Sequence, residues 1–211
     1  LGRAADQMLF STQGLVIPDV GTNSFGQCSL VALVRTPDDE IQALLGDVDV
    51  LQTFGGERRL SRFRSSLASN ELRCSDAARE LLSKSTGFRM FLATPAIFSG
   101  GWLPGWLDPV SLEGTPPTVE SNLRLKLRGA CVQRWRAVSG WDLEQRTEKP
   151  VRRLVPAGSV YFFHKVEGSG EELVDAWMEP VSDEDKDRRD GYGVALWGTW
   201  ECDFTKGGLT E

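Results

Sequence analysis

The chain has 211 residues, 40% hydrophobic and 26% charged, which suits one large or two small folded domains with a real core. No apolar run approaches the ~20 residues of a membrane-spanning helix, and the chain does not begin with a secretory signal. We therefore expect a cytoplasmic protein with no membrane partner. Because the first residue is Leu1 rather than Met, we also expect a piece of a longer protein.

The net charge of −6 taken alone argues against a nucleic-acid-binding protein, but the distribution of the charge does not. Residues 171–190 hold nine acidic side chains and three basic ones, which equals the whole formal imbalance. The rest of the chain is neutral in sum and contains clustered arginine, and local charge decides where a phosphate backbone can lie. We expect the acidic stretch that follows residue 178 to be mobile, and we expect residues 183–190 to lie outside any RNA path, because carboxylates repel phosphates.

The cysteines and the histidine exclude most metal and acid–base chemistry. The four cysteines, Cys28, Cys74, Cys131 and Cys202, are scattered without a C-x-x-C pair. A structural zinc site is therefore not expected. We expect instead that the cysteines are reduced thiols in a cytoplasmic protein. His164 is the one histidine, which removes most general-base and metal schemes. We expect no cofactor and no catalytic residue.

Strands and helices alternate along the first half of the chain. Runs of β-forming residues predict strands at 8–16, 28–35, 60–64 and 88–95. Helix-start residues at 36–40 predict a helix that Gly46 ends, and Ser75 is the expected N-cap of a second helix at 75–83, which Gly87 closes.

A glycine pair followed by arginines stands between the first of these helices and the strand at 60–64. The candidate binding residues here are Gly55, Gly56, Arg58 and Arg59. Adjacent glycines leave backbone amides exposed, and arginines add mobile cations, so this loop is a candidate phosphate contact. The alternative is a solvated basic edge that prevents one sheet from pairing with another.

The segment 99–109 is rich in glycine, proline and tryptophan and is predicted to be an ordered loop. Its two tryptophans, Trp102 and Trp106, have two uses open to them. Either can stack on bases or fill a partner's pocket, or it can pack onto the domain, which is the expectation we favour for each.

The clearest alternation in the chain is at 123–128, where leucines take one face of a predicted strand. Arg124, Lys126 and Arg128 take the other face, and we expect the strand to continue over 130–136, adding Arg134 and Arg136. Between 121 and 136 there are five cations and no acid. A strand with one apolar and one basic face indicates a sheet whose outer surface attracts polyanions. A merely solvated face is the alternative.

The last third carries a second arginine pair and a second glycine loop. Arg152 and Arg153 precede a predicted strand at 160–165, Ser139–Asp142 is an expected turn, and a helix is expected at 171–178. Gly191, Tyr192 and Gly193 then lead into a strand at 194–200. Glycines at such a position suit a phosphate cradle built from free amides, or a tight turn before a buried strand.

Too few helices are predicted for a doubly wound sheet, so an α+β fold with a mainly antiparallel sheet is expected. Three stretches, 55–59, 153–163 and 191–200, carry a resemblance in their order and spacing. With them the chain resembles the third subunit of the type III-B CRISPR (Cmr) effector complex, a family of the RNA-binding RAMP superfamily. The resemblance covers the C-terminal half to two-thirds of the usual family member.

The resemblance implies a ferredoxin-like (RRM-like) RAMP fold. Residues 1–110 would hold a partial first ferredoxin-like unit with connecting loops, and residues 111–211 a C-terminal unit with the glycine-rich loop. It further implies a non-catalytic scaffold subunit that grips the 5′ handle of the CRISPR RNA. Such a subunit contacts the large polymerase-like subunit and the backbone RAMP subunits. A RAMP-type endoribonuclease that processes CRISPR RNA and a protein-only scaffold are the alternatives.

Overall fold

The computed structural model describes residues 34, 36, 38–54, 59–65, 73–120, 122–142 and 144–201, leaving aside the side chain of Arg59. The predicted strands at 8–16 and 28–35 and the loop residues Gly55, Gly56 and Arg58 lie outside the described residues. The chain divides into two compact units, Leu1–Ser69 and Asn70–Glu211, and each is described by itself.

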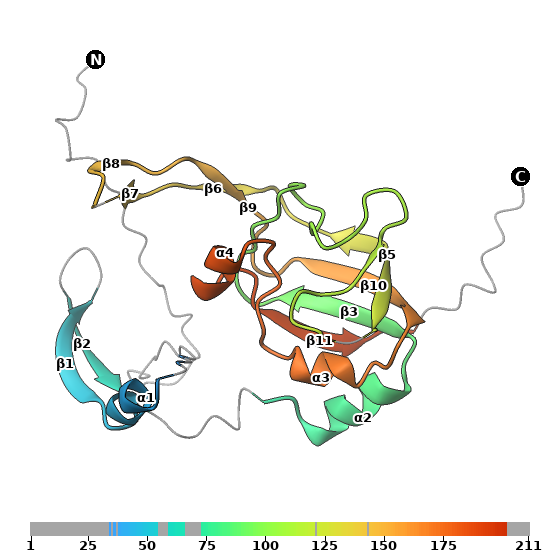
Figure 1. Ribbon diagram of the computed structural model, residues 1–211, viewed down its shortest axis with the longest axis horizontal. Helices are drawn as coiled ribbons and strands as arrows, with labels where there is room; N and C mark the ends of the chain where they lie inside the picture. The colour runs from blue at the N-terminus through green and yellow to red at the C-terminus, as the bar shows by residue number, and fades with distance from the viewer. Residues whose placement is uncertain are drawn as a thin grey trace, which may run out of the picture. The chain divides into compact units, whose positions relative to one another are not determined.

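In the part of the first unit that the structure describes, a helix is followed by a hairpin (Figure 1). Helix α1 (Asp39–Gly46) begins where helix-start residues predicted it, with the Asp38 carboxylate accepting hydrogen bonds from the Glu40 and Ile41 amides. Strands β1 (Asp49–Phe54) and β2 (Arg59–Arg64) pair antiparallel, and Arg62 reaches across to Asp49 at 2.6 Å. The strand at 60–64 is thus confirmed, while β1 was not predicted because its side chains do not alternate.

The second unit is built on a five-stranded antiparallel sheet in the order β11-β3-β10-β5-β4. The strands are β3 (Gly87–Leu92), β4 (Glu113–Gly114), β5 (Arg124–Cys131), β10 (Val160–Glu167) and β11 (Ala195–Thr199). Every pairing within it is antiparallel. The α+β class with a mainly antiparallel sheet is therefore confirmed, whereas the ferredoxin-like topology stays a prediction.

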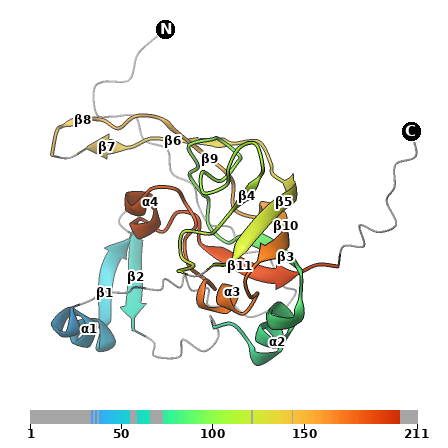
Figure 2. The same ribbon diagram turned by 45° about the vertical axis from the view of Figure 1, so that its right-hand side comes forward.

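One face of this sheet carries the core. Phe88, Met90 and Phe163 point into it and are fully buried. Leu82 of helix α2 (Asp76–Lys84) and Leu173 of helix α3 (Glu172–Asp175) pack in the same cluster. The two helices lie along the β11 edge of the sheet in Figures 1 and 2. Their apolar side chains therefore close the core from that side.

Two short two-stranded ribbons lie end to end in the segment between β5 and β10. Strand β6 (Arg136–Val138) pairs with β9 (Arg152–Leu154), and β7 (Trp141–Asp142) pairs with β8 (Thr147–Glu148). The Lys149 amide donates to the Gly140 carbonyl at 2.8 Å, which joins the ribbons into one long hairpin. Figure 1 shows this hairpin leading away from the five-stranded sheet.

Several predicted boundaries are wrong in this unit. The strand expected to run on to residue 136 ends at Cys131, and a separate strand begins at Arg136. The expected turn at 139–142 contains β7, and the helix expected at 171–178 is the four-residue α3. The predicted helix at 75–83 is confirmed as α2, with Ser75 as its N-cap, but Ser85 is its C-cap and Gly87 opens β3.

The acidic stretch after residue 178 is folded, which contradicts the expectation that it is mobile. It contains helix α4 (Asp185–Arg189), and the side chain of Asp187 is fully buried. The Asp183 carboxylate accepts hydrogen bonds from the Ser99 and Gly105 amides, at 2.7 and 2.8 Å. These acids are used to satisfy polar groups inside the domain rather than to solvate its surface.

The sheet of the second unit spans residue 110, since β3 precedes that position and β5 follows it. The compact units divide at 69/70. The partition into two ferredoxin-like units, drawn from the resemblance, stays a prediction.

Candidate nucleic-acid interface

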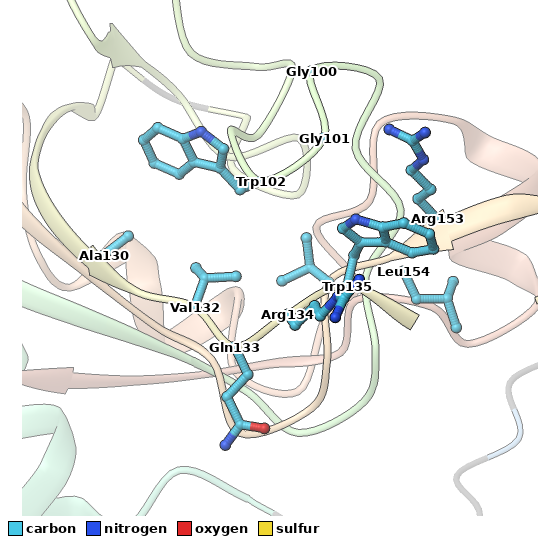
Figure 3. A pocket seen from close by; sticks show the side chains of 11 residues that line it. Gly100, Gly101, Trp102, Ala130, Val132, Gln133, Arg134, Trp135, Arg153 and Leu154 are labelled. Carbon is cyan, nitrogen blue, oxygen red and sulfur yellow. The ribbon is translucent and has the colours of Figure 1, made fainter. Parts of the chain in front are cut away.

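A pocket of about 550 Å³ opens between the loop after β3, the end of β5 and strand β9. Trp102, Trp135 and Val132 line it, and Figure 3 shows the two indole rings on either side of an open space. Trp102 is 52% exposed and Trp135 is 47% exposed. Val155 and Leu154 add further apolar wall. The pocket is therefore an aromatic and aliphatic cavity that solvent can enter.

Two arginines, Arg134 and Arg153, belong to this pocket. The Arg153 guanidinium carbon lies 4.8 Å from the centre of the Trp135 ring, in a cation–π contact that Figure 3 shows. Among the described residues that line the pocket there is no Asp or Glu. The cavity is thus positively charged beside an apolar floor.

The fold fixes both walls of the pocket. The phenol of Tyr161, in β10, donates a 2.6 Å hydrogen bond to the backbone carbonyl of Trp102. Burial raises the pKa of Tyr161, so its hydroxyl remains a donor well above neutral pH. On the opposite side, Val155 exchanges backbone hydrogen bonds of 2.8 and 2.9 Å with Ala96. The tryptophan loop and the base of the hairpin are therefore held to the same core.

The other tryptophan of the loop behaves as expected. Trp106 is part-buried and stacks on Phe163, with ring centres 5.6 Å apart. It is a core residue, and only Trp102 of the predicted pair presents its ring to the pocket.

The glycine loop at 191–193 is a turn whose amides are already used. The amides of Gly191, Tyr192 and Gly193 donate to the carbonyls of Arg188, Asp187 and Pro95, at 3.1, 3.0 and 2.8 Å. The predicted cradle of free amides is therefore wrong. Both glycines have positive φ, +81° and +85°, which explains why the sequence has glycine there.

The predicted alternation of leucines and cations in the basic strand is confirmed. Arg124 and Lys126, however, lie next to carboxylates on the neighbouring strands. Leu125 and Leu127 are buried, and Arg124, Lys126 and Arg128 are on the other face. Neighbouring strands supply carboxylates: Lys126 lies 3.0 Å from Glu113, and Arg124 lies 3.7 Å from Glu113 and 3.5 Å from Glu167. Arg124 and Lys126, both expected phosphate contacts, thus have partners within the domain.

Of the arginines around the hairpin, the structure separates one from the rest. Arg152 forms a bidentate pair with the buried Asp187. Its hydrogen bonds to that carboxylate raise the pKa of the guanidinium. By contrast Arg134, Arg136 and Arg153 are exposed, and within the described part of the chain none of them forms an ion pair.

The structure therefore brings together Arg134 and Arg153 of the predicted site residues, with Arg136 next to them on β6. It places Gly191, Tyr192 and Gly193 in a separate turn and Arg124, Lys126 and Arg128 on the sheet. Trp135 was not among the predicted site residues. A tryptophan between two arginines, in a segment without acids, is the sequence signal that would have found it.

Among the residues that the structure describes, no group of three His, Cys, Asp or Glu side chains is placed to hold a metal ion. The thiols of Cys74 and Cys131 are free, and burial raises the pKa of Cys74. His164 lies part-buried in β10, opposite Lys126 and Gly87 in the sheet register.

In the described part of the chain, no helix is long and apolar enough to cross a membrane.

Taken together, the fold and the pocket define an α+β protein that presents exposed tryptophans and exposed arginines at one surface. The chain matches the family model described as CRISPR-associated protein (Cas_Cmr3) over residues 2–200. It belongs to that family, and the resemblance to the third subunit of the type III-B Cmr complex is confirmed. No curated protein matches the chain.

Proposed function

We propose that this chain is a non-catalytic RNA-binding scaffold subunit of a type III-B CRISPR effector complex, where it holds the 5′ handle of the CRISPR RNA. Family membership supports a place in the Cmr assembly. In the proposal, the subunit also contacts the large polymerase-like subunit and the backbone RAMP subunits.

One observation carries the RNA-binding part of the proposal. Arg134 and Arg153 line a pocket with exposed tryptophans and, among its described lining residues, no carboxylate. Arginine binds phosphate oxygens through parallel N–H donors, and tryptophan stacks on bases that are not paired. Single-stranded RNA offers both groups in alternation along its length.

The overall charge of −6 does not oppose this proposal. Several of the acids in segment 171–190 are occupied within the domain, as Asp183 and Asp187 show. Screening also limits the reach of distant charges to about 8 Å at physiological salt, so the arginines at the pocket dominate its local potential.

The test is binding of labelled handle RNA to the full chain, measured at several salt concentrations. We expect Arg134→Ala with Arg153→Ala to weaken binding and to lower the slope of log affinity against log salt by about 0.7 per lost phosphate contact. Arg79→Ala is the matched control, because Arg79 is an exposed arginine on α2, away from the pocket lining. An unchanged slope in the double variant would contradict the proposal, and a protein-only scaffold would then explain the chain better.

The non-catalytic part has its own test. RNA cleavage at neutral pH usually relies on histidine as a general acid or base, and this chain has one, His164. We expect handle RNA to be recovered intact after incubation with the full chain in the absence of metal. Cleavage that disappears in His164→Ala would support an endoribonuclease instead.

A further inference from the structure

We propose that the pocket between Trp102 and Trp135 takes one unstacked nucleobase of single-stranded RNA, held by its flat faces rather than read by its edges. The inference rests on the proposed function, since it names the part of the RNA that this pocket binds. It assigns the two tryptophans a role in binding that the arginines do not share.

The exposure of the two indoles is the first argument. Trp102 and Trp135 are 52% and 47% exposed. Trp106, in the same loop as Trp102, instead packs on the core. Large aromatic side chains that line an open apolar cavity mark a binding surface more often than a packing defect. The cavity volume, about 550 Å³, falls within the range for small-ligand pockets, roughly 300–1,000 Å³.

The charge at the pocket decides between an RNA base and an apolar side chain of a protein partner. Arg134 and Arg153 stand beside the cavity, and no described lining residue is acidic. A base always arrives with phosphates attached to its ribose, and these need cations next to an apolar recess. A leucine or phenylalanine of a partner protein needs the recess but not the two arginines.

The contact between Arg153 and Trp135 is the third argument. The guanidinium lies over the indole at 4.8 Å, so Arg153 is positioned before any ligand arrives. A base that stacks on Trp135 therefore brings its neighbouring phosphate towards a cation that is already oriented. This arrangement lowers the entropy lost when the side chain is immobilised on binding.

The walls also set the selectivity. They are mainly aliphatic and aromatic, from Val132, Leu154 and Val155 as well as the tryptophans. Apolar walls stack on any base, because every base has a π-face, and apart from Gln133 and the two arginines the lining supplies few donors or acceptors to tell one base edge from another. We therefore expect this pocket to bind adenine, guanine, cytosine and uracil with similar affinity.

The experiment compares two single-stranded decamers of equal charge, decaadenylate and a ribose-phosphate decamer in which abasic spacers replace every base. For each protein variant, the measured quantity is the ratio of the two affinities for the full chain. Phosphate contacts cancel in this ratio, so it reports the contribution of the bases.

We expect Trp102→Ala and Trp135→Ala each to lower the ratio by about 5- to 150-fold, the range for loss of one base–aromatic stack. Trp141→Ala is the matched control, since Trp141 is 44% exposed in β7 but does not line the pocket. It should leave the ratio unchanged. Arg153→Ala should lower both affinities, and its effect on the ratio should be much smaller than that of either tryptophan variant.

A ratio that stays at the wild-type value in both tryptophan variants would overturn the inference, even if handle RNA still binds. If those variants instead lose assembly with other Cmr subunits, the pocket takes a protein side chain and the inference is wrong. Base-dependent binding through the pocket without preference for the handle would leave the inference standing and contradict the proposed function. If the full chain binds neither decamer, the inference is overturned as well. Since both indoles are exposed, either variant should fold, and one folded variant is enough to decide.

Discussion

Arg152 and Asp187 form a bidentate ion pair that ties strand β9 to helix α4, across 35 residues of chain. The carboxylate is fully buried, whereas the arginine side chain is 35% exposed. Asp187 also precedes the glycine loop, and its backbone carbonyl accepts a 3.0 Å hydrogen bond from Tyr192. The pair thus connects the base of the pocket hairpin to the turn at 191–193.

Removing the arginine of this pair should be more costly than removing the acid. Arg152→Ala leaves a buried carboxylate without a partner, and we expect a loss of about 3 kcal/mol in the free energy of unfolding. This is the lower end of the usual range, because the partial exposure of Arg152 screens the pair. Asp187→Ala leaves an arginine that can turn to water, so a smaller loss is expected. Urea unfolding of both variants measures the difference.

The double variant provides the control for this prediction. Replacing both residues by alanine should cost less than the sum of the single losses, because neither charge is then left alone. Additive losses would show that the two side chains do not interact in solution.

The contrast between Arg152 and Arg153 shows which of their contacts could be predicted from the sequence. Both were predicted to bind RNA, yet adjacent residues of a strand point to opposite sides. Arg152 meets Asp187 and Arg153 meets Trp135. The period-two rule separates the two arginines but does not say which one finds an acid, because that acid comes from a distant segment.

The same reasoning explains which elements were predicted. Strand β5 was found because buried Leu125 and Leu127 alternate with cations, and α2 because Ser75 caps it. Strands β1, β7 and β8 were missed because their side chains are largely exposed and leave no apolar alternation. The pocket was missed because its walls come from three segments that only the folded chain brings together.

The two glycines of the loop at 191–193 offer a matched pair of alanine substitutions. Both have positive φ, so each alanine pays a strain of about 1–2 kcal/mol. A Cβ on Gly193 would also lie 2.6 Å from the hydroxyl oxygen of Ser182, whereas one on Gly191 meets nothing within 4 Å. We expect Gly193→Ala to lower the melting temperature clearly more than Gly191→Ala. Equal melting temperatures would mean that the backbone near Ser182 yields easily.

The cations of β5 should matter less to RNA than those of the pocket. Arg124 and Lys126 already face Glu113, so a phosphate must compete with a carboxylate for them. We expect Arg124→Gln with Lys126→Gln to change the affinity for handle RNA by less than about threefold, with little change in the salt slope. The comparison is Arg134→Gln with Arg153→Gln, which should change both. A larger effect of the β5 pair would restore the basic strand as the principal phosphate contact.

The buried phenol of Tyr161, which donates to the Trp102 carbonyl, should make the stability of the domain depend on pH in the alkaline range. Burial raises the pKa of Tyr161 in the folded state above its ordinary value, about 10. The unfolded chain therefore loses this proton first, so the stability contributed by the neutral phenol is complete below about pH 10 and falls as pH rises above it.

Tyr161→Phe removes the ionisable group and the hydrogen bond together. We expect the variant to be about 1 kcal/mol less stable at pH 7, and its stability to fall less steeply between pH 9.5 and 11.5. Urea unfolding at each pH measures both quantities. Identical slopes for the two proteins would show that Tyr161 ionises as readily in the folded state as in the unfolded chain.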